Sequence, residues 1–587
     1  MKIREVDNAL LADLGLTPPD LEMLQPTAAS YTCLLLQPSG PIFASEQRIG
    51  GLDQALNEVK ALAFLRLAKG GGAGLAVAPE YFVPWPSLGK LLAEGTVPGV
   101  GALWVLGFES ITLENLAALQ AELKHACDFL YEPAENLPAD RVLLDPVVLL
   151  FNGKKADGSS RLVALVQFKT LACRDDLFEE EALLKRGATI YQFRGANTGP
   201  LTAAVIICSD AFSLSDVIVP DLVDRGTLIH IQLNPDPRNQ AYRQYRKTAF
   251  ELDDRASDCH IVCLNWARTI ALHHKDGSCE SWPPVGCSTW YCSNDACSPS
   301  DEIIVPNQGH GVYYAYMKER RHVLLLDYDE AVFELRVPKV MTKGKGVIAN
   351  KNGPNANARY VWSDAACAWE VQAGPPSHSY DQLIGSNADV QAALVHVNGA
   401  SAIDIERLLA LSAASINGTD GWLVPKEIDA FVIGPEEVVK RVTVAQDAHE
   451  EATAFRHRRL SVMANLRQIL NVHKPWPPQL VGMDQNAQIR WSKDRSSFNV
   501  WTQDGVPSLV TYLDYEPDAR TLENKVSMLI NLVRRAELGD QKRIAVLYRK
   551  YGELKFADMP GLTRYDDAQE DETDLAAVDT SSVFKEE

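Results

Sequence analysis

The chain has 587 residues, of which 46% are hydrophobic, and a formal net charge of −20 at pH 7. This length exceeds one typical domain, so we expect two or more domains. The acidic balance argues against a nucleic-acid partner, because neutralising phosphates requires clustered Lys and Arg. No apolar run approaches the roughly 18 residues of a membrane span, and residues 1–16 lack the apolar segment of a signal peptide. We therefore expect no membrane association and a cytoplasmic location, where the eleven cysteines stay reduced.

The first part of the chain predicts alternating strands and helices. Residues 1–27 are interpreted as a leader with a short helix, and residues 31–37 as the first strand. Residues 52–69 place apolar side chains near i, i+3, i+4 and i+7 and are followed by three glycines, which predicts a helix with a glycine stop. The apolar run 102–108 predicts a further strand. This alternation predicts an α/β fold.

Three predicted buried strands each lead into one residue that could act in catalysis. They are residues 74–79 before Glu80, residues 162–168 before Lys169, and residues 203–207 before Cys208. A strand fixes such a side chain, while the turn that follows leaves backbone N–H groups free to face a reacting oxygen. Buried cysteines are common in cores, and Glu80 with Lys169 would also suit a structural ion pair. An ion pair, however, explains neither Cys208 nor the order of the three residues.

The order Glu, Lys, Cys within the motifs PEYF, FKTL and ICSD resembles the carbon–nitrogen hydrolase family, also called the nitrilase superfamily. The resemblance implies that Glu80 is a general base, that Lys169 is the triad lysine and that Cys208 is the nucleophile. It also implies an α-β-β-α sandwich, in which two sheets pack face to face between helices. Self-association into a dimer or a larger homo-oligomer is expected, and neither a cofactor nor a metal ion is implied.

Further blocks in the same order extend the resemblance from about Tyr31 to Pro338. They are an Arg-Ala pair before a strand ending in Asn (255–265), a Gly-x-Ser strand (286–288) and the closing strands 323–327 and 333–337. The family carries a second acid near its site, and Glu180 matches it best by spacing. Alternatively, Glu180 belongs to the start of a helix over 179–185, where acids favour the positive end of the dipole. Ser209 departs from the family, whose cysteine is usually followed by an aromatic residue, and this leaves the substrate class open.

The predicted chemistry gives each residue type a separate task. A thiol with a pKa of about 8.5 is mostly protonated at pH 7, so Glu80 would take its proton and Lys169 would favour the thiolate. Attack on an amide or nitrile carbon develops negative charge, which Lys169 and the backbone N–H beyond Cys208 would stabilise. Ser209 and Asp210 are the expected oxyanion or pocket positions. Ammonia or an amine leaves, a thioester forms, and Glu80 activates water to release the acid.

A second cluster of Cys and His invites a zinc interpretation. Its members are His273, His274, Cys279, Cys287, Cys292 and Cys297. No Cys-x-x-Cys pair occurs among them, and Cys287 belongs to a strand of the resemblance. A loop rich in Asp, Gly, Ser and Pro near the mouth of the pocket is the favoured interpretation.

Beyond residue 340 the composition changes. Residues 1–340 are predicted as the hydrolase domain and 341–379 as a linker or wrapping arm, with one candidate strand at 359–362. Residues 380–560 are predicted as a mainly helical (α+β) domain. The predicted helices cover 401–415, 435–471 and 521–538, and residues 491–515 have a β-like pattern. Residues 561–587 are acidic and predicted to be disordered or an interaction tail.

Three functions fit these observations. The first is an amidase-type hydrolase of a small amide or nitrile. The second is an acyltransferase that uses the same triad with an acceptor other than water. The third is an assembly or regulatory protein, such as a bacterial defence subunit, in which the C-terminal region binds a protein partner. No Ser-Gly-Gly loop of an ATP-pyrophosphate domain follows the hydrolase region, which disfavours a fused ammonia-consuming synthetase.

Overall fold

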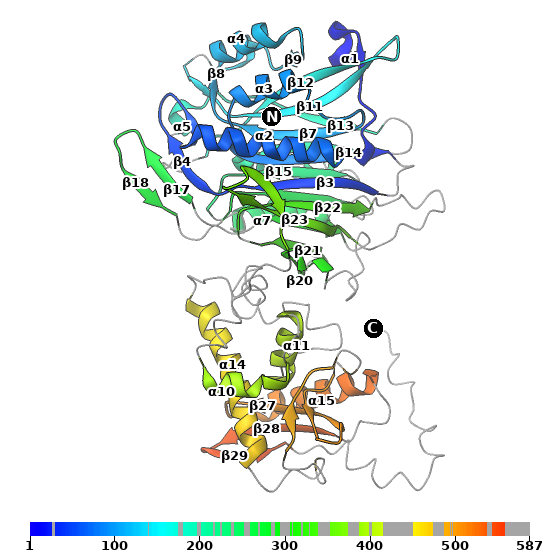
Figure 1. Ribbon diagram of the computed structural model, residues 1–587, viewed down its shortest axis with the longest axis vertical. Coiled ribbons are helices and arrows are strands. Elements are labelled where there is room, and N and C mark those ends of the chain that lie inside the picture. Colours follow the sequence, from blue (N-terminus) through cyan, green and yellow to red (C-terminus); the bar gives the residue numbers. More distant parts are fainter. Residues whose placement is uncertain are drawn as a thin grey trace. The chain divides into compact units, whose positions relative to one another are not determined.

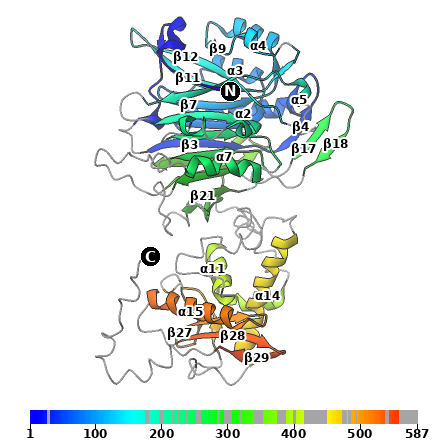
Figure 2. The ribbon, with the colours of Figure 1, turned by 180° about the vertical axis from the view of Figure 1, so that it is seen from behind.

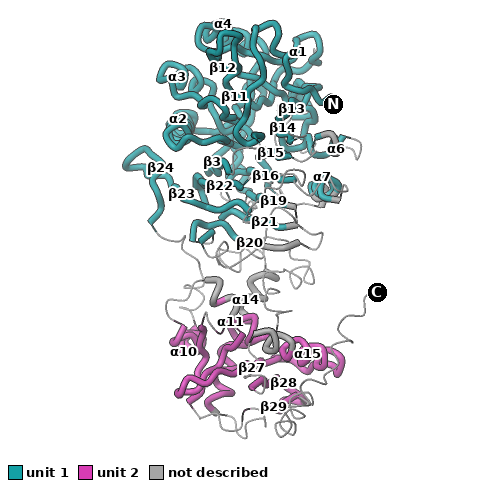
Figure 3. The backbone as a smooth tube through the Cα atoms, turned by 90° about the vertical axis from the view of Figure 1, so that its right-hand side faces the viewer, with its two compact units in different colours: residues 1–377, 434–439 teal, residues 378–433, 440–587 magenta. Residues whose placement is uncertain are grey.

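The computed structural model divides into two compact units, residues 1–377 with 434–439 and residues 378–433 with 440–587 (Figure 3). It describes residues 1–25, 30–138, 140–173, 180–195, 201–214, 218–222, 226–235, 240–251, 259–267, 270–282, 288–293, 306–307, 309–317, 321–327, 329–338, 353–373, 387–397, 402–414, 450–472, 480, 486–492, 495, 497–536 and 543–557. The fold is mixed α/β with several sheets (Figure 1). Outside the described residues lie Arg255, Ala256, Gly286, Cys287, Cys297 and the acidic tail 561–587.

A ten-stranded sheet in the first unit carries Glu80 and the strand before Lys169. Its order is β24 (Ala368–Val371), β23 (Asn355–Ser363), β22 (Ala331–Pro338), β3 (Ser30–Gln37), β6 (Leu75–Val83), β7 (Leu103–Phe108), β11 (Pro146–Lys155), β12 (Ser160–Phe168) and β9 (Asp128–Leu130), with β2 (Leu16–Thr17) paired to β11. Strands β3, β6 and β7 are parallel neighbours. All residues of β6 and β7 are buried, which explains their continuous apolar runs.

Helix α2 (Gln54–Gly70) confirms the helix predicted over 52–69. The Asp53 side chain caps it by accepting a hydrogen bond from the N–H of Leu56 at 2.9 Å. The chain leaves the helix through the glycine run, in which Gly72 takes a left-handed φ of 61°. The helix lies in front of the sheet in Figure 1.

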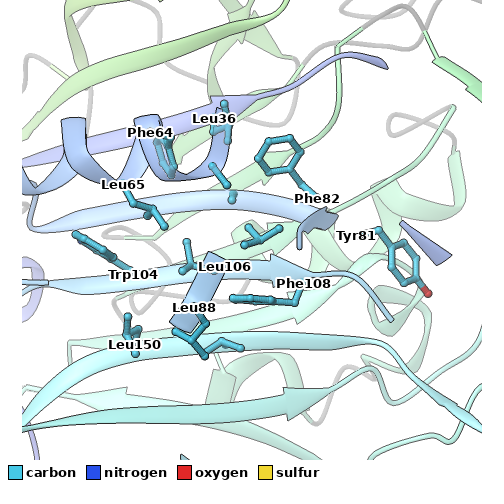
Figure 4. Close-up of a cluster of buried hydrophobic side chains, with 14 of the residues drawn as sticks. Leu36, Phe64, Leu65, Tyr81, Phe82, Leu88, Trp104, Leu106, Phe108 and Leu150 are labelled. Atoms are coloured by element: carbon cyan, nitrogen blue, oxygen red, sulfur yellow. The ribbon is translucent and has the colours of Figure 1, made fainter. Parts of the chain in front are cut away.

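The apolar core of this unit lies between α2 and the parallel strands. Phe64 and Leu65 of the helix pack in one buried cluster with Trp104 and Leu106 of β7 (Figure 4). Fully burying such side chains contributes roughly 1.5–3 kcal/mol each. Tyr81 lies at the end of this cluster with its hydroxyl directed away from the apolar side chains (Figure 4).

An eight-stranded sheet carries the strand before Cys208. Its order is β1 (Lys2–Glu5), β13 (Thr189–Arg194), β14 (Thr202–Ile207), β15 (Thr227–Ile231), β16 (His260–Leu264), β19 (Thr289–Ser293), β21 (Arg321–Leu326) and β20 (Val312–Met317). Strands β14, β15 and β16 are parallel, so their carboxyl ends meet at one edge. Helix α7 (Gln240–Glu251) lies over these strands when the molecule is seen from behind (Figure 2).

The N-terminal residues differ from the predicted leader. Residues 2–5 form β1, which pairs in parallel with β13, and the short helix follows as α1 (Asn8–Leu11). The sequence KIRE has little hydrophobic periodicity because three of its four side chains are exposed. This strand is held by its backbone pairing, which periodicity does not reveal.

Residues 355–371, expected within a linker or wrapping arm, extend the ten-stranded sheet instead. Strand β23 pairs with β22 and β24 pairs with β23, both antiparallel. The indole N–H of Trp369 donates to the backbone oxygen of Lys60 in α2 at 3.0 Å, which attaches this edge to the helix layer. The predicted strand 359–362 therefore lies within a longer one.

The remaining elements of the first unit surround the two large sheets. They are β4 (Gly40–Ala44), β5 (Ile49–Gly51), β17 (Ile270–His274) and β18 (Cys279–Ser281), which form a four-stranded sheet; β8 (Ile111–Thr112) and β10 (Leu143–Leu144), which pair; and helices α3 (Pro86–Glu94), α4 (Leu113–Leu123), α5 (Glu180–Leu183) and α6 (Ile218–Leu222). In Figure 3, α2 and α3 lie on one side of the strands and α6 and α7 on the other.

The second unit combines helices with a five-stranded sheet. Its strands are β25 (Gln488–Ile489), β26 (Val500–Trp501), β27 (Pro507–Leu513), β28 (Ile544–Lys550) and β29 (Glu553–Phe556), and its helices are α10 (Ala388–Ala393), α11 (Ala402–Ser412), α14 (Glu450–Val472) and α15 (Ala519–Ala536). Helices α11 and α15 confirm the predictions over 401–415 and 521–538, and β26 with β27 confirms the β-like pattern of 491–515. Helix α14 confirms the later part of the prediction over 435–471, whose residues before 450 lie outside the described ranges. Among the described helices, none combines the length and apolar character that a membrane crossing requires.

Candidate active site

The structure brings Glu80 and Lys169 into direct contact. Lys169 follows the last residue of β12, and its Nζ lies 2.7 Å from Oε1 of Glu80. Both side chains are only 1% exposed. An ion pair so fully removed from water persists only with good geometry and further hydrogen bonds.

Glu80 lies within β6, where the pairing with β7 is irregular. Gly107 of β7 is required here, because a Cβ on it would lie 2.2 Å from the backbone oxygen of Pro79. The second carboxylate oxygen of Glu80 accepts a hydrogen bond from the N–H of Leu233 at 2.6 Å, just after β15. The carboxylate is thus held between an ammonium group and a backbone donor.

Glu180 joins the same cluster. Its Oε1 lies 2.8 Å from Nζ of Lys169 and accepts a hydrogen bond of 2.8 Å from the Tyr81 hydroxyl. Its Oε2 accepts from the N–H of Cys173 at 2.7 Å. Glu180 does begin a helix, the four-residue α5, but its side chain is 1% exposed and binds Lys169. The structure therefore places it with the Glu80–Lys169 pair.

Asp145 is a buried member of this cluster that sequence reasoning missed. Its Oδ2 lies 3.3 Å from Nζ of Lys169, and its side chain is 1% exposed. It directly precedes β11, whose first residue Pro146 pairs with Phe168 at the end of β12. Aligning the apolar run that begins at Pro146 with the predicted strand 162–168 as a hairpin would have placed Asp145 opposite Lys169.

The charges of this cluster shift the pKa values of its members. Burial raises the pKa of Glu80, against the lowering effect of Lys169. The pKa of Asp145 lies well above its ordinary value because of burial and the neighbouring Glu80 charge. Burial alone would lower the pKa of Lys169, but the charges of Glu180 and Glu80 outweigh it, and the pKa lies well above its ordinary value. Lys169 is therefore cationic at neutral pH.

Cys208 follows β14 and begins a short 3-10 turn over Cys208–Ser213. Its φ of 40° is left-handed, which costs a non-glycine residue about 1–2 kcal/mol. Its Sγ lies 3.8 Å from the Tyr242 hydroxyl of α7, and the residue is 4% exposed. Burial and the charge of Glu80 raise the thiol pKa well above its ordinary value, although Lys169 acts in the opposite direction. Lys169 thus favours the thiolate, as expected, but burial and the Glu80 charge outweigh it.

Ser209 and Asp210 tie the cysteine turn to the segment after Lys169. The Ser209 hydroxyl donates to the backbone oxygen of Leu171 at 2.5 Å. The Asp210 carboxylate accepts from the N–H groups of Thr170, Leu171 and Ile207 at 2.7, 3.0 and 3.1 Å. These side chains were predicted to line an oxyanion site or pocket, but the structure places them against backbone. Burial raises the pKa of Asp210 to about 6.

His230 on β15 contacts the backbone of Cys208. Sequence reasoning did not identify it as a residue of the site. Its Nε2 donates to the backbone oxygen of Cys208 at 2.8 Å, so Nδ1 is the acceptor, facing the Tyr245 hydroxyl at 2.7 Å and the Gln232 amide at 2.8 Å. Burial lowers the pKa of His230 to about 3, so the ring is neutral. His230 lies on β15 and Gln232 directly follows that strand, so the available signal was two polar residues at the end of a mainly apolar run.

Protonation of His230 is expected to destabilise the fold as the pH falls. Its folded pKa of about 3 lies below the ordinary value of about 6.5, so the folded state binds fewer protons than the unfolded chain between these values. The free energy of unfolding therefore decreases as the pH is lowered from about 6.5 to about 3, by up to about 5 kcal/mol in total. Chemical denaturation at pH 6.5 and 4.5 should show a flatter pH dependence for His230→Gln than for the wild type. Exposed His125→Gln is the control and should follow the wild type, and parallel curves for His230→Gln would contradict the prediction.

Two other blocks of the resemblance meet close to Glu80. The N–H of Asn265 donates to the Ser288 hydroxyl at 2.9 Å, and the Asn265 amide donates to the backbone oxygen of Asn234 at 2.7 Å. The indole N–H of Trp266 donates to the backbone oxygen of Glu80 at 2.8 Å. The ends of β15 and β16 therefore hold the strand that carries Glu80.

The Cys and His residues considered above for zinc lie in different parts of the fold where the structure describes them. His273 and Cys279 lie on the β17–β18 pair, with Nε2 and Sγ 3.6 Å apart, whereas Cys292 is buried in β19 of the eight-stranded sheet. In the described part of the chain, the group of three or more potential metal ligands is Glu80, Asp145 and Glu180, with one oxygen of each within 4.8 Å of the others. Lys169 Nζ lies within 3.3 Å of all three carboxyl groups and supplies the positive charge there.

No protein-family model matches the chain, and no curated protein matches its sequence. Similar solved structures include a glutamine-dependent NAD+ synthetase from Acinetobacter baumannii in complex with ADP, at 13% identity and a TM-score of 0.31, covering 65% of this chain and 57% of that one. An amidase mutant of Nesterenkonia AN1 from the nitrilase superfamily has 11% identity and a TM-score of 0.27, covering 45% and 83%. A glutamine-dependent NAD+ synthetase from Cytophaga hutchinsonii has 8% identity and a TM-score of 0.26, covering 88% and 65%. The chain thus spans little more than half the length of the first of these structures.

Proposed function

We propose that this chain is a cysteine-dependent hydrolase of a non-peptide carbon–nitrogen bond, with a small amide or nitrile as substrate. The observation that carries the proposal is the buried 2.7 Å pair of Lys169 and Glu80, formed within electrostatic reach of a cysteine in left-handed conformation. A structural ion pair needs neither a strained cysteine nor two further buried carboxyl groups. Activation of a thiol and stabilisation of an oxyanion need a base and a fixed cation.

In the proposed reaction with an amide, Sγ of Cys208 forms a bond to the carbonyl carbon while its proton passes to Glu80. Because the thiol pKa is raised, this transfer accompanies the attack. Lys169 stabilises the negative charge that develops on the substrate oxygen. Glu80 returns the proton to the departing nitrogen, the C–N bond breaks and a thioester remains. Water then gives a proton to Glu80 and attacks the thioester. The C–S bond breaks, the acid is released, and Glu80 returns the proton to Sγ of Cys208, which restores the thiol.

The proposal includes the α-β-β-α sandwich that the resemblance implies. Two contacts between strands of different sheets support it. The Gln167 amide of β12 donates to the backbone oxygen of Val205 in β14 at 2.9 Å, and the rings of Phe151 and Phe193 meet edge to face at 5.2 Å. Helices on both sides of the strands in Figure 3 are in keeping with such layers. This arrangement would bring the ends of β6, β12 and β14 together.

The proposal is tested by measuring ammonia release from a panel of short amides and nitriles, together with the mass of the peptide that contains Cys208. We expect turnover by the wild type and a transient acyl adduct on that peptide. Glu80→Gln should slow both steps by about 10²-fold or more, since it removes the base. If the acyl group is released from Cys208 only when an amine is added as acceptor, the protein is an acyltransferase. Absence of both turnover and adduct across the panel would contradict the proposal.

A further inference from the structure

Asp145 has a position that the three proposed catalytic residues do not explain. Its backbone oxygen accepts a hydrogen bond from the N–H of Lys169 at 2.9 Å, so the two residues lie opposite each other at the end of the β11–β12 hairpin. Its Oδ2 lies 3.3 Å from Nζ of the same lysine. The side chain is nearly as inaccessible to water as those of Glu80 and Glu180.

The charges of the buried cluster do not balance if every carboxyl group is ionised. Glu80, Asp145 and Glu180 would carry three negative charges against the single charge of Lys169. Their oxygens lie within 4.8 Å of one another, and carboxylates this close in a dry site cannot all ionise. At least one of them must therefore hold a proton at neutral pH.

The three carboxyl groups differ in their hydrogen bonds. Both oxygens of Glu180 accept from donors, namely Lys169, the Tyr81 hydroxyl and the Cys173 N–H. Both oxygens of Glu80 also accept, from Lys169 and the Leu233 N–H. Such donors favour the ionised form of both groups. In contrast, Oδ2 of Asp145 is buried and has no hydrogen-bond partner of good geometry among the described residues.

We propose that Asp145 is a neutral carboxylic acid that donates a hydrogen bond to Glu80 and holds this base in place. The carboxyl groups of Asp145 and Glu80 are close enough to share a hydrogen bond. As a donor, Asp145 adds no charge beside Lys169, and it orients Glu80 without touching a substrate. It is a positioning residue. The charged and titratable groups around it are Glu80 and Tyr81 of β6, Lys169 after β12 and Glu180 of α5.

The pKa of Asp145 supports the same assignment, because burial and the Glu80 charge both raise it well above its ordinary value. The role rests on the proposed function, since it concerns how Glu80 is set up to take the Cys208 proton. When Glu80 receives that proton, Asp145 keeps its own, so the pair holds one proton before the attack and two after it. Asp145 can hold its proton whether or not the protein converts a substrate.

The first test is infrared spectroscopy of the folded protein at pH 7 with isotope-labelled aspartate. We expect a carbonyl band of a protonated aspartic acid in the wild type and its loss in Asp145→Asn. The matched control is Asp157→Asn, in the turn of the same hairpin, where the carboxylate is exposed and binds Ser159. This variant should retain the band. A wild-type spectrum without the band, or a band that persists in Asp145→Asn, would overturn the proposal.

The second test compares Asp145→Asn with Asp145→Ala in amide or nitrile turnover. Asparagine is neutral and can donate to Glu80, so we expect its activity to stay within about fivefold of the wild type, with an unchanged pH profile. Alanine removes the donor, and we expect a loss of about 10²-fold or more. If asparagine is as damaging as alanine in a folded protein, a neutral donor is not what the site requires. If the wild type is inactive but the infrared band is present, the proposed function fails while the proton assignment stands.

Discussion

Replacing Cys208 by alanine is expected to abolish turnover while leaving the fold intact. The proposed thioester cannot form without Sγ, and removing a nucleophile of this kind costs about 10⁴-fold or more in rate. Stability should change little, because alanine at a φ of 40° is strained much as cysteine is. Ammonia release and a thermal melt on the same preparation measure both effects.

Two further variants separate the chemistry of Cys208 from its conformation. Cys33→Ala removes an equally buried thiol from β3 and should keep wild-type activity. Cys208→Gly is also expected to be inactive, but it should be more stable than Cys208→Ala by about 1 kcal/mol, because glycine accepts a left-handed φ without strain. Full activity in Cys208→Ala would refute the assigned nucleophile, and a less stable glycine variant would refute the strain.

Replacing Lys169 by methionine is expected to cause the largest loss of stability of any single substitution at the site. Methionine has similar length but no charge, so Glu80 and Glu180 would stay buried without their cation. Removing one partner of a buried ion pair typically costs about 3–5 kcal/mol. Chemical denaturation at pH 7 measures this loss.

The pH dependence of the Lys169→Met defect has a definite sign. Without the ammonium, the folded pKa of Glu80, which burial already raises, rises further above that of the unfolded chain. The folded variant then binds more protons than its unfolded state, so its stability should recover as the pH falls toward 5. Lys60→Met is the control. Its pair with Glu330 is also 2.7 Å long, but Glu330 is 17% exposed, so the loss should be smaller and less dependent on pH. A Lys169→Met protein as stable as the wild type at pH 7 would contradict the charge balance inferred for the cluster.

How far the site could be predicted depended on whether each residue ends an apolar run. Glu80, Lys169 and Cys208 were found because uninterrupted buried strands stop at or near them, and such runs are visible in a sequence. Asp145 precedes its strand and is brought to Lys169 only by the hairpin register, which links residues far apart in the chain. His230 lies inside a strand, where a single polar residue does not show what it faces. The raised thiol pKa of Cys208 could not be anticipated either, since it comes from burial and not from its partners alone.

The same distinction holds for the fold. Helix α2 was predicted closely because its periodicity, its capping aspartate and its glycine stop agree. Strand β1 and the edge strands β23 and β24 were not assigned to sheets, because their side chains are largely exposed or half-buried and their places depend on backbone pairing. Composition around 341–354 and 373–379, rich in Gly, Pro and Asn, indicated a linker, so only residues 359–362 between them were predicted as a strand.

The pairing of β22 with β23 has a practical consequence for anyone who isolates the first compact unit. A fragment that stops near residue 340 would leave the backbone donors and acceptors of β22 open along one side, and an unprotected strand edge recruits strands from other molecules. It would also lose Trp369, which attaches the edge to α2. A fragment that continues to residue 377 keeps both features and should be the one that stays in solution on concentration.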